Sequence, residues 1–420
     1  MRGAGPLAGL VALGVLVWMV PLQLGWYQDG AITDIPVYRE AAERMVGGAI
    51  PYRDFAFEYP PGAAGIFVLA WPGPFSYGTA FSALMLICLA GTALLAVATA
   101  RALDLSQARV IVAGVGIVVA PLLVGSLVET RFDLALSVAL AGILYGAATR
   151  RFAIAWGALA IGALIKLVPL VLIPALFIYH WHTEGPRRAA TGAAGAVAAF
   201  LVVWAPFIAL SPSGTLDFAR YHLDRPLQIE STGAAYMLGL HALADIGLSV
   251  ETSFGSQNLV GAGPDAISAI STAVLIVLVV AIAVALALAL RATRPPGDAR
   301  LFVAAVAATL VAMLVAGKVL SPQFMLWLLP AALLIAGPTG WGAIGATAAA
   351  LILTQAYFPG MYWDLVALDT IPISLLVLRD LALIAVLVMS WPRPRIARSP
   401  AMSDAARASP SPLPARYILD

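Results

Sequence analysis

Charged residues are scarce in this chain. Asp, Glu, Lys and Arg together make up 11% of its 420 residues, whereas 61% are hydrophobic, and the mean hydropathy is +0.94. This composition excludes an ordinary soluble globular domain. Cysteine occurs once, as Cys88 inside an apolar run, so an intramolecular disulfide is also excluded.

Several functional motifs are missing as well. The sequence has no HExxH, no CxxC and no tight group of carboxylates and histidines, which are the patterns typical of metal centres. It also has no Walker loop and no GxGxxG after a strand pattern. We therefore expect no metal, no cofactor and no nucleic-acid partner.

Long apolar runs recur along the whole chain. Each is about as long as the roughly 20 residues that cross a hydrocarbon core, and the runs are continuous rather than alternating. They predict an all-α polytopic membrane protein with one domain over 1–392 and a disordered cytoplasmic tail over 393–420. The first run is longer than a signal-peptide core, which favours a retained anchor. The twelve expected spans are 6–27, 76–100, 110–127, 134–148, two short helices within 152–181 that meet near Lys166, 189–210, 266–290, 301–317, 322–336, 340–357 and 371–391.

Two polar regions, 28–75 and 211–265, interrupt the apolar runs. In the first, Val37, Ala41 and Met45 are spaced as on one face of a helix, which predicts a short amphipathic helix at the membrane surface. Residues 62–74 are apolar but too short to span, and predict a re-entrant or interfacial segment.

The positions of the basic residues predict the orientation. If the N-terminus is cytoplasmic and the spans alternate, the cytoplasmic segments hold 15 of the 24 basic residues but only 5 of the 22 acidic ones. This bias predicts a multi-pass plasma-membrane protein with both polar regions outside the cytoplasm. An enzyme there would need an activated donor that is delivered in the membrane.

Asp34 is the first candidate for chemistry. A carboxylate a few residues beyond the first span can accept a proton from a hydroxyl group, but Asp34 also stands two residues before Pro36, a good helix N-cap position. Both interpretations stay open, and they are compatible. The sequence Glu58-Tyr59-Pro60-Pro61 predicts a rigid turn, which would aim Glu58 and Tyr59 at the cavity of Asp34.

Lys166 and Lys318 are ionisable groups between apolar runs. Such groups usually face a cavity or a charged partner, and an ammonium suits a phosphate; the alternative is that the side chain reaches to the interface. With Arg131 and Arg225 of the outer loops they would form an anion site for a lipid phosphate. Further candidates in the second polar region are Tyr221 and His222. The pair Arg379–Asp380 lies in mid-span, where a buried structural ion pair is the simpler interpretation.

Together these residues resemble the GT-C superfamily of polytopic glycosyltransferases and, more closely, family 87, the α-mannosyltransferases that use polyprenol-phosphate-mannose. The matching segments lie in family order and cover most of the chain. They are Asp34 with Tyr38, residues 48–54 (GAIPYRD), 58–61 (EYPP), 165–169 (IKLVP), 320–323 (LSPQ) and 326–330 (LWLLP).

The resemblance implies a GT-C-type bundle whose outer loops carry short interfacial helices. It also implies an inverting transfer of mannose from a polyprenyl-phosphate donor to a lipid or glycan acceptor. The family's aspartate in the first outer loop maps onto Asp34 as the base. Some members carry histidines where this chain has Gln323-Phe324-Met325, so we do not expect a histidine-assisted mechanism, and Gln323 becomes a substrate-binding candidate.

The resulting hypothesis is a single displacement. Asp34 would deprotonate the acceptor hydroxyl, while Lys166, Lys318 and Arg225 would stabilise the leaving phosphate. Tyr59 and Tyr221 would line the sugar pocket. Two alternatives remain, namely a transporter or flippase of a lipid-linked sugar and a transferase that uses polyprenyl-phosphate-arabinose.

Overall fold

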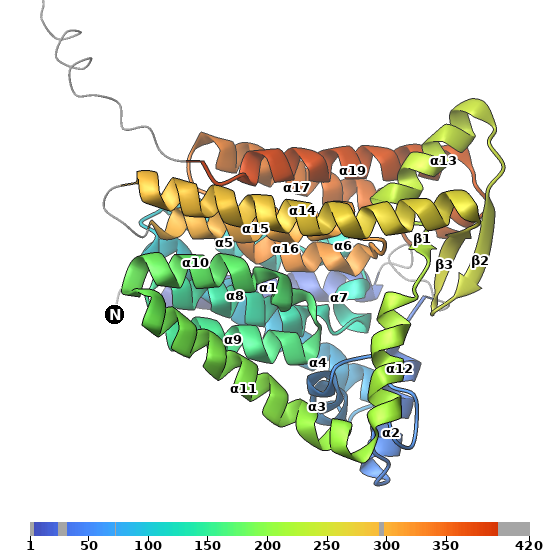
Figure 1. Cartoon of the computed structure of the whole chain (residues 1–420), viewed down its shortest axis with the longest axis horizontal. Helices are drawn as coiled ribbons and strands as arrows, with labels where there is room; N and C mark the ends of the chain where they lie inside the picture. Colours follow the sequence, from blue (N-terminus) through green and yellow to red (C-terminus); the bar gives the residue numbers. More distant parts are fainter. Residues whose placement is uncertain (1–3, 24–31, 72, 294–297, 394–420) are drawn as a thin grey trace, which may run out of the picture.

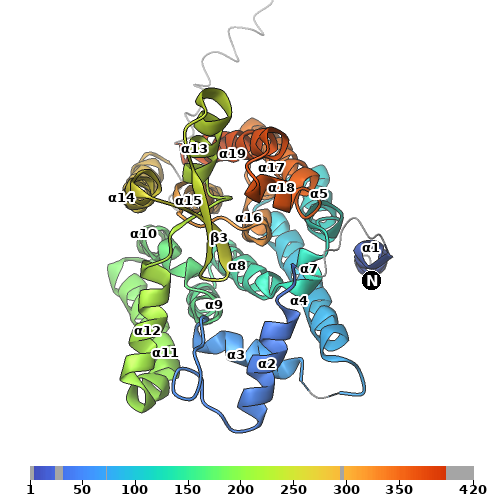
Figure 2. The same ribbon diagram turned by 90° about the vertical axis from the view of Figure 1, so that its right-hand side faces the viewer.

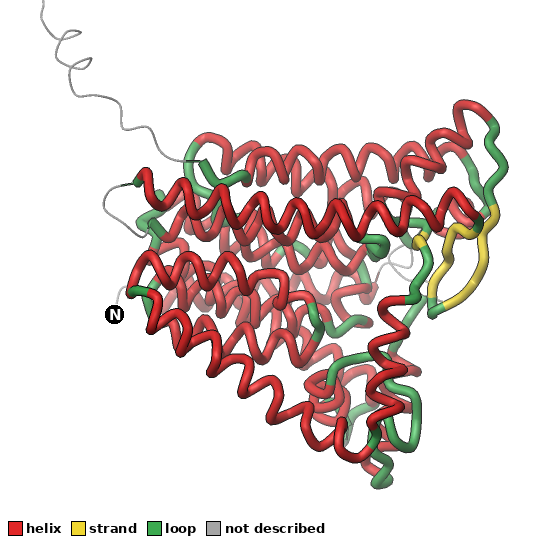
Figure 3. Tube along the Cα trace, viewed as in Figure 1, coloured by secondary structure: helices red, strands yellow, loops and turns green. Residues whose placement is uncertain are grey.

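The computed structural model describes residues 4–23, 32–71, 73–293 and 298–393. Most of its helices run side by side along the long axis of the molecule, and the short strands and several short helices gather at one end (Figures 1 and 3). We call this the loop end, made by α2, α3, α12, α13 and β1–β3. The expected tail at 393–420 lies, apart from residue 393, outside the described residues.

By length and composition, five helices of the described chain can cross a membrane. They are α4 (Tyr77–Ala102), α11 (Pro186–Leu210), α14 (Ala262–Ala292), α15 (Ala299–Ala316) and α19 (Thr370–Ser390). Other apolar helices are α1 (Ala4–Gln23), α5 (Gln107–Val118), α8 (Asp133–Ala148), α9 (Phe152–Ile165) and α17 (Pro338–Tyr357). Residues 24–27 of the first expected span are not described.

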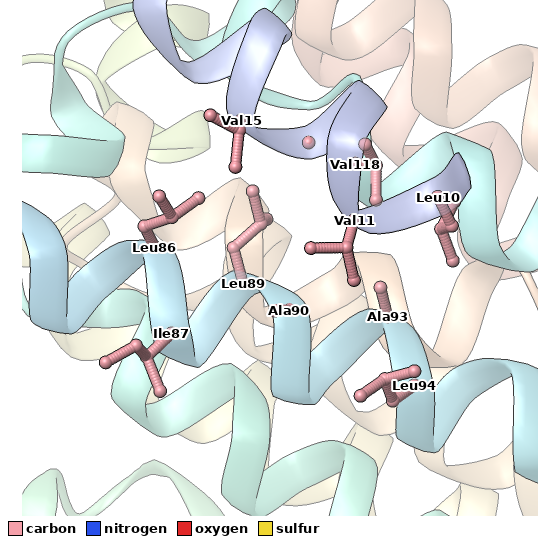
Figure 4. A pocket seen from close by; sticks show the side chains of 11 residues that line it. Leu10, Val11, Val15, Leu86, Ile87, Leu89, Ala90, Ala93, Leu94 and Val118 are labelled. Carbon is pink, nitrogen blue, oxygen red and sulfur yellow. The ribbon is translucent and has the colours of Figure 1, made fainter. Parts of the chain in front are cut away.

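The helices differ in how deeply they are packed. Most side chains of α15 are buried, whereas α11 buries few of its own. In the end-on view α15 lies inside the bundle, while α1 stands at its edge beside α4 and α5 (Figure 2). Between α1, α4 and α5 lies an apolar cavity of about 190 Å³, lined by Val11, Val15, Leu89 and Val118 among others (Figure 4). The polar loop-end residues are not part of its lining.

The split expected near Lys166 is confirmed. Helix α9 ends at Ile165, Lys166 is extended (φ −147°, ψ 145°), and the chain continues as the 3₁₀-helix η2 (Val168–Leu172) and α10 (Ile173–Glu184). Pro169 supports this break, because a continuing helix would need the N–H of residue 169 to bond the carbonyl of Ile165, and proline has no N–H to donate.

Two expected spans are wrong as single helices. The run 110–127 is divided into α5, α6 (Pro121–Val124) and α7 (Leu127–Thr130), and Gly125 has a positive φ of 70° that a continuing right-handed helix does not permit. The run 322–336 forms η3 (Pro322–Phe324) and the eight-residue α16 (Met325–Ala332). Hydropathy shows that a segment avoids water but not whether lipid or protein surrounds it. These segments are buried in protein and do not form one continuous helix across the lipid.

The first polar region forms two of the expected elements. Helix α2 (Ile35–Val46) is the amphipathic one; Pro36 lies in its first turn, and it ends before Gly47. Helix α3 (Pro61–Leu69) is too short to span. Gly48 has φ 93°, a conformation that glycine adopts without strain, and lets the chain turn back toward Tyr52.

The second polar region is not all-α, which corrects the expectation. Between α12 (Pro212–Leu223) and α14 it contains α13 (Thr232–Ala244) and a three-stranded antiparallel sheet of order β1-β3-β2, with β1 (Leu227–Gln228), β2 (Ser249–Ser253) and β3 (Ser256–Val260). The register pairs Leu227 with Leu259 and Val250 with Leu259. A further short helix, α18 (Tyr362–Val366), precedes α19.

Candidate active site

Asp34 forms an ion pair with Arg131. Asp34 stands at the N-cap position of α2, yet its side chain makes no capping hydrogen bond there. One carboxylate oxygen contacts the guanidinium of Arg131, and the other accepts a hydrogen bond from the Tyr38 hydroxyl at 3.1 Å. The Asp34 side chain is 34% exposed and that of Arg131 only 10%. The Asp34 side chain therefore contacts a guanidinium and a hydroxyl and does not cap α2.

An aromatic cluster holds Tyr38 in place. The Tyr38 ring is buried, stacks on Phe67 with centroids 4.4 Å apart, and lies 5.5 Å from Phe132 and 6.0 Å from Tyr59. Close-packed aromatic rings leave little freedom to move. The packed rings therefore hold the Tyr38 hydroxyl in its position against Asp34.

A second carboxylate–cation pair lies beside the first. Lys166 donates to Oδ1 of Asp133 at 2.7 Å, and Nε1 of Trp327 donates to the same oxygen at 2.7 Å. The Asp133 side chain is 1% exposed and the Lys166 side chain 16%. The break at Lys166 allows this contact, because the extended backbone turns the side chain out of the α9 register.

Aromatic faces surround the ammonium of Lys166. Its Nζ lies 4.5 Å from the ring centroid of Phe132, 5.2 Å from that of Trp327 and 5.4 Å from that of Phe324. Phe324 and Trp327 stack with centroids 4.0 Å apart. Gln323 is adjacent to Phe324 in η3, so its segment borders the ammonium. The interpretation of Lys166 as a residue that reaches to the interface is not supported, because its charge is bound inside the protein.

The turn at residues 58–61 meets α12. His222 Nε2 lies 3.1 Å from the backbone oxygen of Glu58, and burial lowers the pKa of His222, so neutral imidazole is favoured. Burial first, and then the Glu58 carboxylate, raises the pKa of Tyr59 and of Tyr221. Glu58, Tyr59, Tyr221 and His222 thus come together at this turn.

Arg225 and Lys318 belong to the outer part of the site. Arg225 donates to Ser256 Oγ at 3.2 Å, and Lys318 Nζ donates to the backbone oxygen of Leu223 at 2.6 Å. Burial lowers the pKa of Lys318. Lys318 interacts electrostatically with Asp224 and Arg225, whereas Lys166 interacts with Asp133, Arg131 and Glu58. The four expected cations therefore form an inner pair, Arg131 and Lys166, and an outer pair, Arg225 and Lys318.

A buried network around Glu230 interacts electrostatically with Arg131 of the inner pair. Glu230 accepts hydrogen bonds from Tyr357 (2.8 Å) and Gln228 (3.2 Å), and its backbone oxygen accepts one from Arg379. Burial raises the pKa of Glu230 to about 7. The expected Arg379–Asp380 pair is present at 2.7 Å with both side chains buried. Arg379, through its hydrogen bond to the backbone oxygen of Glu230, ties α19 to the segment between β1 and α13.

Three residues of this site escaped the sequence reasoning: Asp133, Trp327 and Glu230. Asp133 had a usable signal, since it follows Arg131 by two residues at the start of an apolar run. Trp327 lies in the segment 326–330 that carries the family resemblance, but its contact with Asp133, 194 residues away, could not be seen there. Glu230 had no signal, and its partner Tyr357 is 127 residues away. Within the described residues no group of three His, Cys, Asp or Glu side chains could hold a metal ion.

Comparison with known families shows which family the chain belongs to. The model of glycosyltransferase family 87 matches residues 57–317. This chain belongs to glycosyltransferase family 87. The resemblance inferred from the sequence is thereby confirmed, and with five apolar spans the chain is a multi-pass membrane glycosyltransferase. The match includes Glu58, Asp133, Lys166 and Glu230 and begins after Asp34.

A solved structure resembles this family-87 chain at low identity. It is ArnT from Cupriavidus metallidurans bound to undecaprenyl phosphate, with 15% sequence identity and a TM-score of 0.48; the match covers 93% of this chain and 77% of that one. No curated protein matches this chain.

Proposed function

We propose that this chain transfers a mannosyl residue from a polyprenyl-phosphate donor to a hydroxyl group of a lipid or glycan acceptor, on the extracytoplasmic face. The observation that carries the proposal is the pair of neighbouring carboxylate–cation contacts, Asp34–Arg131 and Asp133–Lys166, at the loop end of a family-87 chain. Transfer of a sugar from a glycosyl phosphate requires both a negatively charged and a positively charged group. A carboxylate takes the acceptor proton, and cations bind the leaving phosphate.

Asp34 is the proposed base. Its pairing with Arg131 favours the ionised carboxylate, and its side chain is the more exposed of the two. Both carboxylates contact a cation and a hydrogen-bond donor, but the Asp133 side chain is only 1% exposed, so an acceptor hydroxyl cannot reach it and its role is to anchor Lys166.

The reaction is a single displacement that inverts the anomeric centre. The acceptor oxygen forms a bond to the anomeric carbon while the bond from that carbon to the phosphate oxygen breaks. The bonding electrons leave with the phosphate, and the acceptor proton passes to Asp34. The phosphate needs positive charge rather than a proton, and Lys166 and Arg131 supply it, with Arg225 and Lys318 further out.

Two features support a donor dissolved in the membrane. The sequence has no nucleotide-binding motif, and the site lies at the end of helices that are apolar enough to cross a bilayer. Tyr59, Tyr221 and Gln323 are placed to contribute to the sugar pocket, and specificity for mannose is part of the proposal taken from the family resemblance.

The test uses purified protein in lipid nanodiscs with polyprenyl-phosphate-mannose labelled in the sugar. Formation of a new mannoside on an added acceptor, stable to the mild acid that cleaves the donor, supports the proposal. The same assay with polyprenyl-phosphate-arabinose separates the two donors. If donor only moves between leaflets of sealed vesicles and no glycoside forms with any acceptor, the protein is a transporter and the proposal is wrong.

A further inference from the structure

A second cavity, whose mostly apolar lining carries several charged side chains, lies far from the loop end. It has a volume of about 370 Å³ and sits where α10 turns into α11, at the opposite end of the bundle (Figure 1). Its lining includes Phe152, Trp156, His180, Glu184, Arg187 and Arg188. The proposed transfer reaction uses none of these residues.

His180 presents a hydrogen-bond donor to this cavity. Its side chain is only 4% exposed, and Trp156 Nε1 donates to His180 Nδ1 at 3.0 Å. A neutral imidazole whose Nδ1 accepts carries its proton on Nε2. That Nε2 has no hydrogen bond of normal geometry within the described chain, and Glu184 Oε2 lies 3.5 Å from it. The stacked ring of Phe152, with centroids 3.8 Å apart, fixes the direction of this donor.

The start of α11 adds positive charge to the same cavity. Gly185 turns the chain with φ 93°, Pro186 begins the helix, and the N–H groups of the first turn have no partner within the helix. These groups and the helix dipole attract anions. Helix α11 comes close here, because a Cβ on Gly192 would lie 2.4 Å from Cδ1 of Trp156.

The net charge of the lining matches one anion. Arg187 and Arg188 carry two positive charges and Glu184 one negative charge, which leaves one positive charge. Glu184 contacts Arg188 at 3.3 Å in an i,i+4 pair, in which the Arg188 side chain is 72% exposed and free to reach a ligand. A phosphodiester carries a single negative charge and accepts hydrogen bonds through its two non-bridging oxygens, for which arginine is well suited.

We propose that this cavity binds the phosphodiester of a phospholipid headgroup. A lipid is the expected source because the cavity lies at the end of apolar helices, and Trp181, next to His180, is 49% exposed there, as is typical of a membrane interface. The site is independent of the glycosyl-transfer reaction and of which face of the membrane it occupies.

The test is calorimetric titration of the full chain in detergent with dihexanoyl-phosphatidylglycerol. The variant R187Q/R188Q should bind about tenfold more weakly or worse, because it loses both charged donors. The matched control is R101Q/R291Q, which removes two exposed arginines that do not line the cavity. Its affinity should stay within about twofold of the unmodified protein. Equal affinities of the two double variants, with unchanged thermal unfolding, would overturn the proposal.

Two further probes separate headgroup from soluble anion. Inorganic phosphate should bind at least about tenfold more weakly than the short-chain lipid, and dihexanoyl-glycerol, which has no phosphate, should not compete. Inorganic phosphate of equal affinity would overturn the assignment to a lipid. Full competition by dihexanoyl-glycerol would overturn recognition through phosphate.

Discussion

Lys166 donates a hydrogen bond to Oδ1 of Asp133 at 2.7 Å, although the two residues lie 33 positions apart, Asp133 at the start of α8 and Lys166 in the break after α9. The ammonium therefore occupies a defined place beside the Asp34–Arg131 pair. A buried charge with a buried partner is held firmly, since separating the pair would leave both uncompensated. Variants that disrupt this pair therefore test the inner part of the site.

Replacement of Asp34 by Asn should lower kcat about 10²- to 10⁴-fold, because the amide cannot take the acceptor proton. Binding of the donor should change much less. The measurement is mannosyl transfer in nanodiscs, with Asp217→Asn as the control, since the Asp217 side chain is 70% exposed in a local pair on α12. Full activity of Asp34→Asn would show that another group is the base.

Replacement of Asp133 by Leu should destabilise the protein by about 3–5 kcal/mol, because Lys166 and Trp327 lose their shared acceptor inside the protein. Thermal unfolding in detergent measures the change. The comparison is Glu43→Leu, which removes an exposed pair with Arg39 and should cost less than about 1 kcal/mol. Similar losses for the two variants would contradict the buried pair.

Trp327→Phe offers a finer test of the same contact. The phenyl ring can keep the stack on Phe324, whereas the Nε1 donor to Asp133 is lost. We expect a loss of about 1–3 kcal/mol, the cost of one unmade buried hydrogen bond to a charged group, and reduced transfer with the KM for donor raised. Phe324→Leu is the complementary variant, because it removes the stack but keeps the hydrogen bond. Unchanged unfolding and kinetics of Trp327→Phe would exclude a role for the indole donor.

The raised pKa of Glu230 predicts that the free energy of unfolding depends on pH. Burial raises its pKa to about 7 in the folded chain, so between the unfolded value of about 4.5 and 7 the folded state binds more protons than the unfolded state. The contribution of Glu230 to the free energy of unfolding is therefore fully present below about pH 4.5. It falls by roughly 3 kcal/mol as the pH rises to about 7. Unfolding midpoints of the native chain and of Glu230→Gln between pH 4.5 and 8 measure it. Parallel curves for the two proteins would show that Glu230 is not the group responsible.

Gly214→Ala tests how the two polar regions join. A Cβ at Gly214 would lie 1.9 Å from the backbone oxygen of Tyr52, and Ser211 donates to that same oxygen at 3.0 Å. The helix α12 would have to move away from the first loop, at a cost of about 1–3 kcal/mol in unfolding free energy. At Gly195, where nothing lies within 4 Å, alanine should be neutral or stabilising by up to about 1 kcal/mol. A neutral Gly214→Ala would mean that α12 does not rest on Tyr52.

The sequence predicted much of the helical layout and part of the site. The runs that form α4, α11, α14, α15 and α19 are long and apolar, and such runs have few alternatives to a spanning helix. The break at Lys166 was visible because a charge and a proline interrupt the apolar pattern. The runs that become α5–α7 and η3–α16 were misjudged, because hydropathy is the same whether a segment is buried in lipid or in protein.

Local chemistry in the sequence by itself determined the candidates. Lys166 and Lys318 are charges between apolar runs, whereas Asp34, Glu58 and Tyr59 lie in a charged region that interrupts an otherwise apolar chain. Only the tertiary structure decided their partners. Asp34 pairs with Arg131 rather than capping α2, Lys166 pairs with Asp133, and Lys318 lies with Arg225 in the outer part. The physical reason is that a charge on an apolar background shows that a partner is needed, whereas the packing of distant helices determines which partner comes within a few ångströms.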